Sequence, residues 1–127
     1  MRSGQYNLTF SQRPDYLSVH LQAALIDLDI AIRYINELMG HLRSHSDRRV
    51  LFVRETPQLT HQQDYAMIAS IIANMLPAGV SFAIVDYSPS YKIVKECLLQ
   101  ESKSKNRNLM AFDTYAAAET WLLAQQN

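Results

Sequence analysis

The sequence has little of what usually marks a specialised class of protein. It has one cysteine, Cys97, so an internal disulfide and a cysteine-based metal site are both excluded. It also has only three glycines and four prolines, and no glycine-rich phosphate-binding loop, internal repeat or low-complexity tract. These absences indicate an ordinary globular domain rather than a disulfide-rich, repetitive or fibrous chain.

Positive and negative charges are present in equal numbers. Twelve Lys and Arg balance twelve Asp and Glu, so the formal net charge is zero and does not favour nucleic acid as a partner. The first residues carry no apolar segment after their charge, so we expect no secretory signal. The most apolar stretch, residues 65–76, is too short to span a bilayer. We therefore expect one cytoplasmic domain, residues 1–127, without integral membrane association.

Alternation of apolar and polar residues opens the chain. Residues 5–12 and 16–23 each place apolar side chains at every second position, and Arg13-Pro14-Asp15 between them is a turn signal. We predict a β-hairpin at the edge of a sheet.

Three further strands and four helices follow. The runs at 48–53, 81–87 and 108–113 are predicted strands, and the first two are apolar enough to be covered on both faces. Asp27 or Asp29 is expected to cap the first helix, Ser88-Pro89 to begin the third, and Thr114 to cap the fourth. The apolar positions at helical spacing are Ala31, Ile35, Leu38 and Leu42, then Tyr65, Ile68, Ile72 and Met75, then Val94, Cys97 and Leu98, and finally Ala117, Ala118, Trp121 and Leu122.

The predicted order is β-β-α-β-α-β-α-β-α, an α/β fold with a mixed five-stranded sheet and four helices. The expected core residues are Val50, Leu51, Phe52, Val53, Ile84 and Val85, with Trp121 packed against the sheet. Right-handed crossovers between successive neighbouring strands put all their helices on one face. Either some helices cross to the second face, or another molecule covers it. That apolar face and the edge hairpin lead us to expect a homodimer.

These segments resemble a known family. The hairpin, the helix after "DLD", the "RRVLFV" strand, the "LPAGVSFAIV" passage and the terminal "DTYAAAETWLL" look like STAS domains, and more narrowly like small bacterial SpoIIAA-like (STAS-like) proteins. The resemblance implies the same fold and a partner-binding, regulatory role. Several STAS domains switch partners when a serine in an Asp-Ser-Ser-Gly type motif is phosphorylated. The corresponding passage here is "QLTHQQDY", which lacks that motif, so we expect no phosphorylation switch.

One candidate site lies in the loops after the two central strands. Thr60 and Gln63 have the spacing of a helix capping box, which accounts for both residues, and the loop is also suited to hold an anion or a partner. The residues predicted to form this candidate ligand or partner loop are Glu55, Thr60, His61, Asp86, Tyr87 and Ser88.

Metal and nucleophile chemistry have weaker candidates. Glu55, Asp86 and Asp113 sit where parallel strands end and together could hold Mg²⁺, but acids beside helix starts are usually explained by the helix dipole. His41 and His45 share one helix face without a third histidine near them. Cys97 lies within an apolar stripe and is expected to be a core residue. We therefore expect no metal site and no cofactor.

Basic residues gather in the connections that lead into strands, opposite the acids. Helix dipoles account for this polarity, and a docking patch for an acidic partner is the alternative. The residues are Arg43, Arg48, Arg49, Lys103, Lys105 and Arg107.

Without a nucleophile–base pair, phosphate loop or metal cluster, the sequence favours a non-enzymatic module that binds a protein partner. The alternative is a carrier of a small apolar or anionic, lipid-like ligand near the strand-to-helix loops. A closed apolar pocket with converging polar groups would favour the carrier, and a flat apolar face would favour the interaction module.

Overall fold

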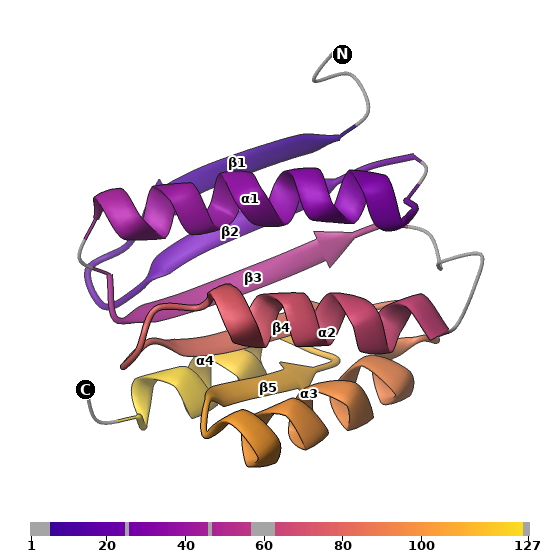
Figure 1. The fold of residues 1–127 in the computed structure, drawn as a ribbon. Helices are drawn as coiled ribbons and strands as arrows, with labels where there is room; N and C mark the ends of the chain where they lie inside the picture. The colour runs from indigo at the N-terminus through magenta and orange to yellow at the C-terminus, as the bar shows by residue number, and fades with distance from the viewer. Residues whose placement is uncertain (1–5, 25, 46, 57–62, 126–127) are drawn as a thin grey trace.

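The structure, a computed structural model, describes residues 6–24, 26–45, 47–56 and 63–125. It is an α/β fold with the predicted order of elements, and the predicted fold class is confirmed (Figure 1). The elements are β1 (Asn7–Gln12), β2 (Leu17–Gln22), α1 (Leu28–Ser44), β3 (Arg49–Glu55), α2 (Gln63–Met75), β4 (Ser81–Asp86), α3 (Tyr91–Lys105), β5 (Asn108–Phe112) and α4 (Tyr115–Leu123).

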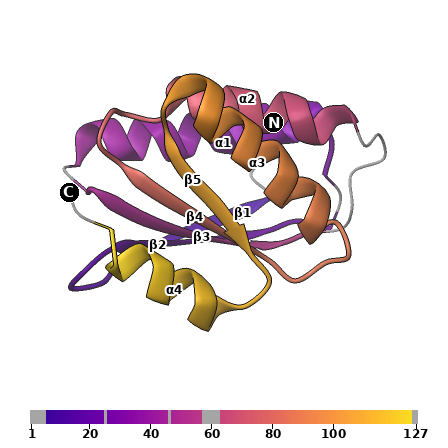
Figure 2. The same ribbon diagram turned by 90° about the horizontal axis from the view of Figure 1, so that it is seen from below.

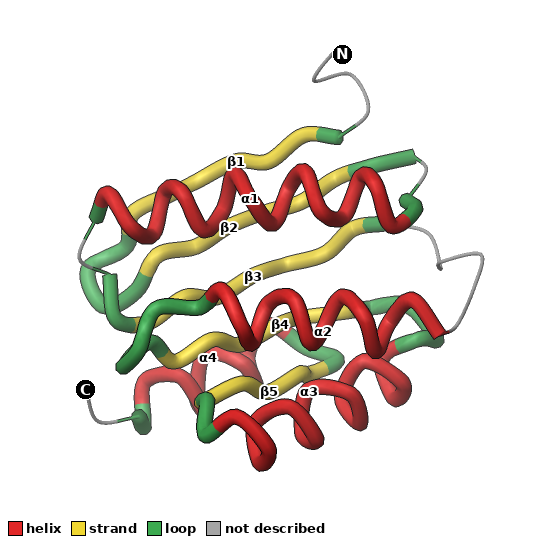
Figure 3. The backbone as a smooth tube through the Cα atoms, in the orientation of Figure 1, coloured by secondary structure: helices red, strands yellow, loops and turns green. Residues whose placement is uncertain are grey.

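The five strands lie side by side in the order in which they occur in the chain. β1 and β2 pair antiparallel, and the pairs from β2 to β5 are parallel. α1, α2 and α3 cover one face of the sheet, and α4 covers the other (Figure 2). The tube view shows how the first three helices run across the same side of the strands (Figure 3). Among the described residues, no helix is both long and apolar enough to cross a membrane.

Alternation along the strands separates two cores. Val50, Phe52 and their partners in register on neighbouring strands face α1, α2 and α3 and form the larger cluster. Leu51, Val53 and Val85 face α4 and form the smaller one. All six strand residues predicted to be core are buried. The continuous apolar runs of β3 and β4 therefore reflect coverage on both faces.

Local signals placed the helix ends as expected in two cases. Oδ1 of Asp27 accepts a hydrogen bond from the backbone amide of Ile30 at 2.9 Å, so Asp27 rather than Asp29 caps α1. Oγ1 of Thr114 accepts from the amide of Ala117 at 3.2 Å and caps α4. Asn106 ends α3 in the left-handed conformation with φ of 54°, which asparagine tolerates better than most residues.

α4 covers the apolar part of the second face of the sheet. It follows β5, the last of the described strands, and does not lie between two of them, so the handedness of the crossovers among these strands does not constrain it. It packs on the face opposite the other helices, where Ala118 and Leu122 are buried against β3 and β4. Trp121 is half-buried and packs against Phe112, with ring centroids 5.7 Å apart. The predicted packing of Trp121 against the sheet is confirmed.

A hydrogen-bonded triad fastens α4 to the hairpin. The hydroxyl of Tyr16, beside β2, donates to Oε2 of Glu119 at 2.7 Å and lies 2.7 Å from the hydroxyl of Tyr115. Burial, the Tyr115 hydrogen bond and the Glu119 carboxylate together raise the pKa of Tyr16 well above its ordinary value. The neutral phenol therefore stays a donor, which holds the short α4 helix on the sheet.

The rest of the second face is polar. Thr9, Ser18 and His20 point to the same side of the sheet as Leu51 and Val53, as the strand register requires. An apolar second face was one motive for expecting a homodimer. α4 covers the apolar part, and polar residues form the remainder, so that motive no longer applies.

Candidate functional site

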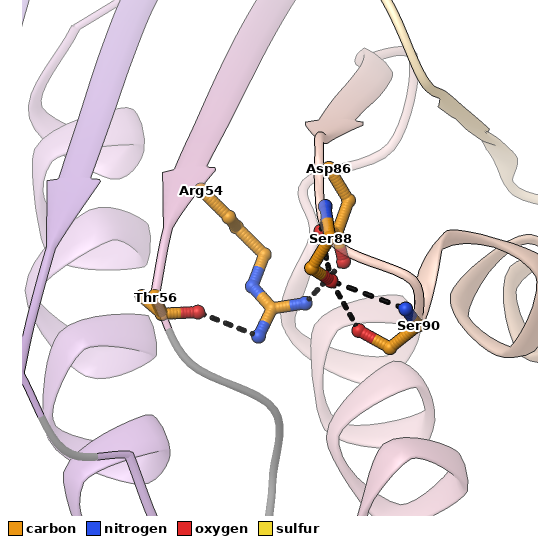
Figure 4. A network of polar contacts seen from close by, with 5 residues as sticks. All are labelled: Arg54, Thr56, Asp86, Ser88 and Ser90. Atoms are coloured by element: carbon orange, nitrogen blue, oxygen red, sulfur yellow. Dashed lines mark hydrogen bonds and ion pairs between the residues drawn. The ribbon is translucent and has the colours of Figure 1, made fainter.

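Five polar residues meet at the carboxyl ends of the two central strands. Arg54 and Thr56 come from the end of β3 and the residue after it, and Asp86, Ser88 and Ser90 come from the end of β4 and the connection to α3 (Figure 4). We call this set the Arg54–Asp86 network. It lies where the predicted partner loop begins.

An ion pair forms its centre. Arg54 and Asp86 are opposite each other in the β3–β4 register, so their side chains leave the sheet on the same face. Nη1 of Arg54 donates to Oδ2 of Asp86 at 2.9 Å. The two residues are only 7% and 2% exposed. Each charge would be costly to bury alone, so each depends on the other and on further hydrogen bonds.

Those further bonds come mainly from hydroxyl groups. Nη2 of Arg54 donates to Oγ1 of Thr56 at 3.1 Å. Oδ1 of Asp86 accepts from the backbone amide of Ser88 at 2.9 Å and from its hydroxyl at 2.7 Å. Among the described residues, Nε of Arg54 is buried without a hydrogen-bond partner. The carboxylate is thus better satisfied than the guanidinium.

Ser88 does not begin α3, contrary to the prediction. Its hydroxyl is held by Asp86, touches the hydroxyl of Ser90 and accepts from the amide of Ser90 at 3.2 Å. Its carbonyl accepts from the amide of Tyr91 at 3.1 Å, which forms a single turn before the helix. α3 therefore starts at Tyr91, with Ser90 as the N-cap residue. The reason is competition, because a nearby carboxylate binds the hydroxyl that would have capped the helix.

Tyr87 is the exposed member of this region. It lies between Asp86 and Ser88, whose backbone is fixed by the network, yet its side chain is 56% exposed. Tyrosine is enriched at protein interfaces, where its ring and its hydroxyl can both make contacts. A rigid turn thus presents an aromatic ring to solvent.

Glu55 does not join the network. It follows Arg54 in the strand, so its side chain leaves the opposite face of the sheet. There its Oε1 lies 2.7 Å from Nε2 of His20 and accepts from Nε2 of Gln22 at 3.2 Å. Glu55 and Asp86 therefore do not converge, and Asp113 lies exposed beyond β5. No group of three or more His, Cys, Asp or Glu among the described residues is placed to hold a metal ion.

Thr60 and His61 lie outside the described residues. The structure therefore brings together Asp86, Tyr87 and Ser88 of the six predicted loop residues and sets Glu55 apart on the other face. It adds Arg54, Thr56 and Ser90, which the prediction missed. A signal for Arg54 was present, because it continues the alternation of Val50 and Phe52 and so belongs to the same face of β3.

A small apolar cavity lies next to the network. Its volume is about 20 Å³, enough for roughly one water molecule. Arg54 is the one charged residue among its described lining residues. Tyr34 also lines the cavity, and burial raises the pKa of Tyr34 above its ordinary value. The others that line it are Phe52, Tyr65, Ile68, Ala69, Ile72, Ile84, Val94 and Leu98.

The remaining candidates have structural explanations. His41 stacks between Phe10 and His45, with centroid distances of 4.0 Å on each side, and Nδ1 of His45 lies 2.8 Å from the carbonyl oxygen of His41. The ring faces, not the ring nitrogens, meet. Cys97 is half-buried against the larger core, and burial raises the pKa of its thiol, which disfavours the reactive thiolate.

The basic residues lie at the other end of the sheet. Arg48 borders three shallow surface depressions of about 320, 500 and 370 Å³, which it shares with Arg49, Arg107 and Arg43 respectively. Lys105 instead forms an ion pair with Glu101 at 2.7 Å. This end also holds the carboxyl termini of α1 and α3, where cations are favoured. The helix dipole therefore accounts for much of this basic cluster.

Neither a scan against protein-family models nor a search of curated proteins finds a match for this chain.

Proposed function

We propose that this protein is a non-enzymatic regulatory module that binds a protein partner in the cytoplasm, of the STAS or SpoIIAA-like type. The predicted order of elements supports the kinship, although fold likeness alone carries no function. The module would use no cofactor and, lacking the Asp-Ser-Ser-Gly motif, no serine switch of that kind. The partner surface is the carboxyl end of β3 and β4.

One observation carries this proposal. Tyr87 is exposed on a turn whose two neighbours, Asp86 and Ser88, are held by a buried network. An aromatic side chain on a rigid turn loses little conformational entropy when it binds, which is a common property of interface anchors. Loops held by a rigid scaffold are where binding residues gather.

The alternative function, a carrier of a lipid-like ligand, fits the same region less well. Pockets for small molecules have volumes of roughly 300–1,000 Å³. The apolar cavity beside Arg54 has about 20 Å³. To carry a ligand, α2 and α3 would have to move away from the sheet and expose Ile68, Ile72 and Leu98, which are buried in the core.

The test compares three baits in the native host. Wild type, Tyr87→Ala and Leu123→Ala are each used for affinity purification with quantitative mass spectrometry. Leu123 is the matched control, because it is also exposed and apolar but lies on α4, across the sheet. We expect a protein that wild type and Leu123→Ala recover and Tyr87→Ala loses by about tenfold or more, the effect of an anchor residue.

The interaction is then reconstituted from purified components. Direct binding of the recovered protein to wild type, weakened by Tyr87→Ala alone, would support the proposal. Equal recovery of every enriched protein by all three baits would contradict the assignment of this surface.

A further inference from the structure

The two edge strands of the sheet, β1 and β5, differ in how far other parts of the chain contact their outer main-chain groups. At the β5 edge, Oγ of Ser102 on α3 donates to the carbonyl oxygen of Leu109 at 2.9 Å and accepts from its amide at 3.2 Å. The amide of Arg107, just before β5, also bonds to the carbonyl of Ser102 at 3.2 Å. α3 therefore occupies main-chain groups at this edge and leaves less of it to another strand.

No described residue covers the β1 edge in this way. β1 pairs with β2 on one side, and no described residue hydrogen-bonds to its main chain from the other side. Its six residues, "NLTFSQ", contain none of the lysines, prolines or inward charges by which proteins usually protect an edge strand. An uncharged, six-residue edge whose outward amides and carbonyls have no partner among the described residues is a template for another β-strand.

We propose that this edge pairs antiparallel with β1 of a second copy of the chain, which joins two five-stranded sheets into one. This inference does not depend on the proposed function, whose surface lies at the carboxyl ends of β3 and β4. A second copy fits because the strand is uncharged and its two faces are distinct. Two-fold symmetry then sets like face against like face without charge repulsion.

Several two-fold registers are possible, and the side chains favour an axis at Thr9 over one at Phe10. Leu8 and Phe10 are half-buried on the α1 face of β1, while Asn7, Thr9 and Ser11 are exposed on the other face. A two-fold axis at Thr9 places Leu8 opposite the partner's Phe10, so the dimer contains two such apolar pairs. An axis at Phe10 would instead place Leu8 opposite the partner's Gln12. Pairing of Thr9 with the partner's Phe10 would set the apolar face of one sheet against the polar face of the other, and two-fold symmetry excludes it.

Such an interface is small, because one strand and the flank of α1 supply it. We therefore expect a weak dimer whose dissociation constant is on the order of micromolar or higher, as for interfaces below the standard size. Measurements should span from about 5 to about 500 μM protein to cover this range.

Disulfide trapping tests the register. In a Cys97→Ser background, Thr9→Cys places a thiol at the axis, where opposite Cα atoms are roughly 4.5–5.5 Å apart and within disulfide range. Ser11→Cys is the matched control, since it is exposed on the same face but roughly 13 Å from its own copy. We expect mild oxidation to cross-link Thr9→Cys into a dimer at least tenfold faster than Ser11→Cys.

Sedimentation equilibrium tests the association itself. Wild type should move from 14.6 kDa towards twice that mass as concentration rises. Thr9→Lys places two like charges at the axis and should raise the dissociation constant tenfold or more. Ala116→Lys, at an exposed position of α4, should not change the dissociation constant. Circular dichroism checks that both variants fold. A wild-type monomer over the whole range, or equal cross-linking at positions 9 and 11, would overturn the proposal.

Discussion

Arg54 and Asp86 are charged and buried, so their contacts must offset the free-energy cost of removing them from water. Each is a charge removed from water, and a buried ion pair is not stabilising merely because it exists. In such an ion pair each residue depends on the other, because removal of one leaves the other charge buried without a partner. In this protein that dependence also fixes the turn that carries Tyr87, through the bonds from Ser88 to Asp86.

We expect Arg54→Met to lower the free energy of unfolding by about 3–5 kcal/mol, the usual cost of an orphaned buried charge. The double variant Arg54→Met with Asp86→Asn removes both charges, keeps an acceptor for Ser88 and should recover part of the loss. Glu55→Gln, at the next position but in an exposed pair with His20, should cost less than about 1 kcal/mol. Urea denaturation measures all three, and equal losses for Arg54→Met and Glu55→Gln would contradict the assignment.

Among the elements, α4 differs from the other helices. α1, α2 and α3 each connect two parallel strands, and their face follows from the handedness of crossovers. α4 does not lie between two described strands, and it is held by packing, by the Tyr16–Tyr115–Glu119 triad and by the bonds of Arg49 and Asn108 to Gln125 just after the helix. It is short, so it depends on tertiary contacts rather than on helix propensity.

Neighbouring leucines on α4 provide a test of this packing. Leu122 is fully buried against the sheet, whereas Leu123 is 42% exposed. Leu122→Ala should destabilise the protein by about 2–4 kcal/mol through lost burial and the cavity left behind. Leu123→Ala, with the same chemistry on the same helix, should stay within about 0.5 kcal/mol of wild type. If urea denaturation gave both variants the same midpoint, α4 would not cover the second face as described.

At the scale of the whole molecule, coverage of the sheet is uneven. β3 and β4 pair on both sides and have helices on both faces, whereas β1 pairs on one side and has α1 on one face only. Local stability should follow this coverage, because amides exchange through openings that break the fewest contacts.

Native-state hydrogen exchange checks that gradient. At a protein concentration well below the dissociation constant of the proposed dimer, amides of β3 and β4 should exchange slowest, near the limit set by global unfolding. Amides of β1 should exchange fastest among the strands, by at least an order of magnitude relative to β4. A uniform exchange rate across the five strands would contradict the uneven coverage.

The sequence alone determined the elements, their order and much of their orientation. Alternation in β1 and β2, continuous apolar runs in β3 and β4, and the cap Thr114 are local signals that were interpreted correctly because they depend on neighbouring residues, whereas the first cap was narrowed only to Asp27 or Asp29. That the residues after β3 and β4 lie together at one edge of the sheet also followed, since parallel strands end at one edge. Asp86, Tyr87 and Ser88 were named for that reason.

Only the tertiary structure decided which residues meet. The partner of Asp86 is Arg54 because the β3–β4 register sets them opposite each other, and register depends on how strands align across the sheet. The same parity sends Glu55 to the other face. Ser88 appeared to be a helix cap until a carboxylate two residues earlier was placed within reach of its hydroxyl. The face of α4 was undetermined because no crossover constrains a helix after the last strand, so packing against Leu51, Val53 and Val85 decided it.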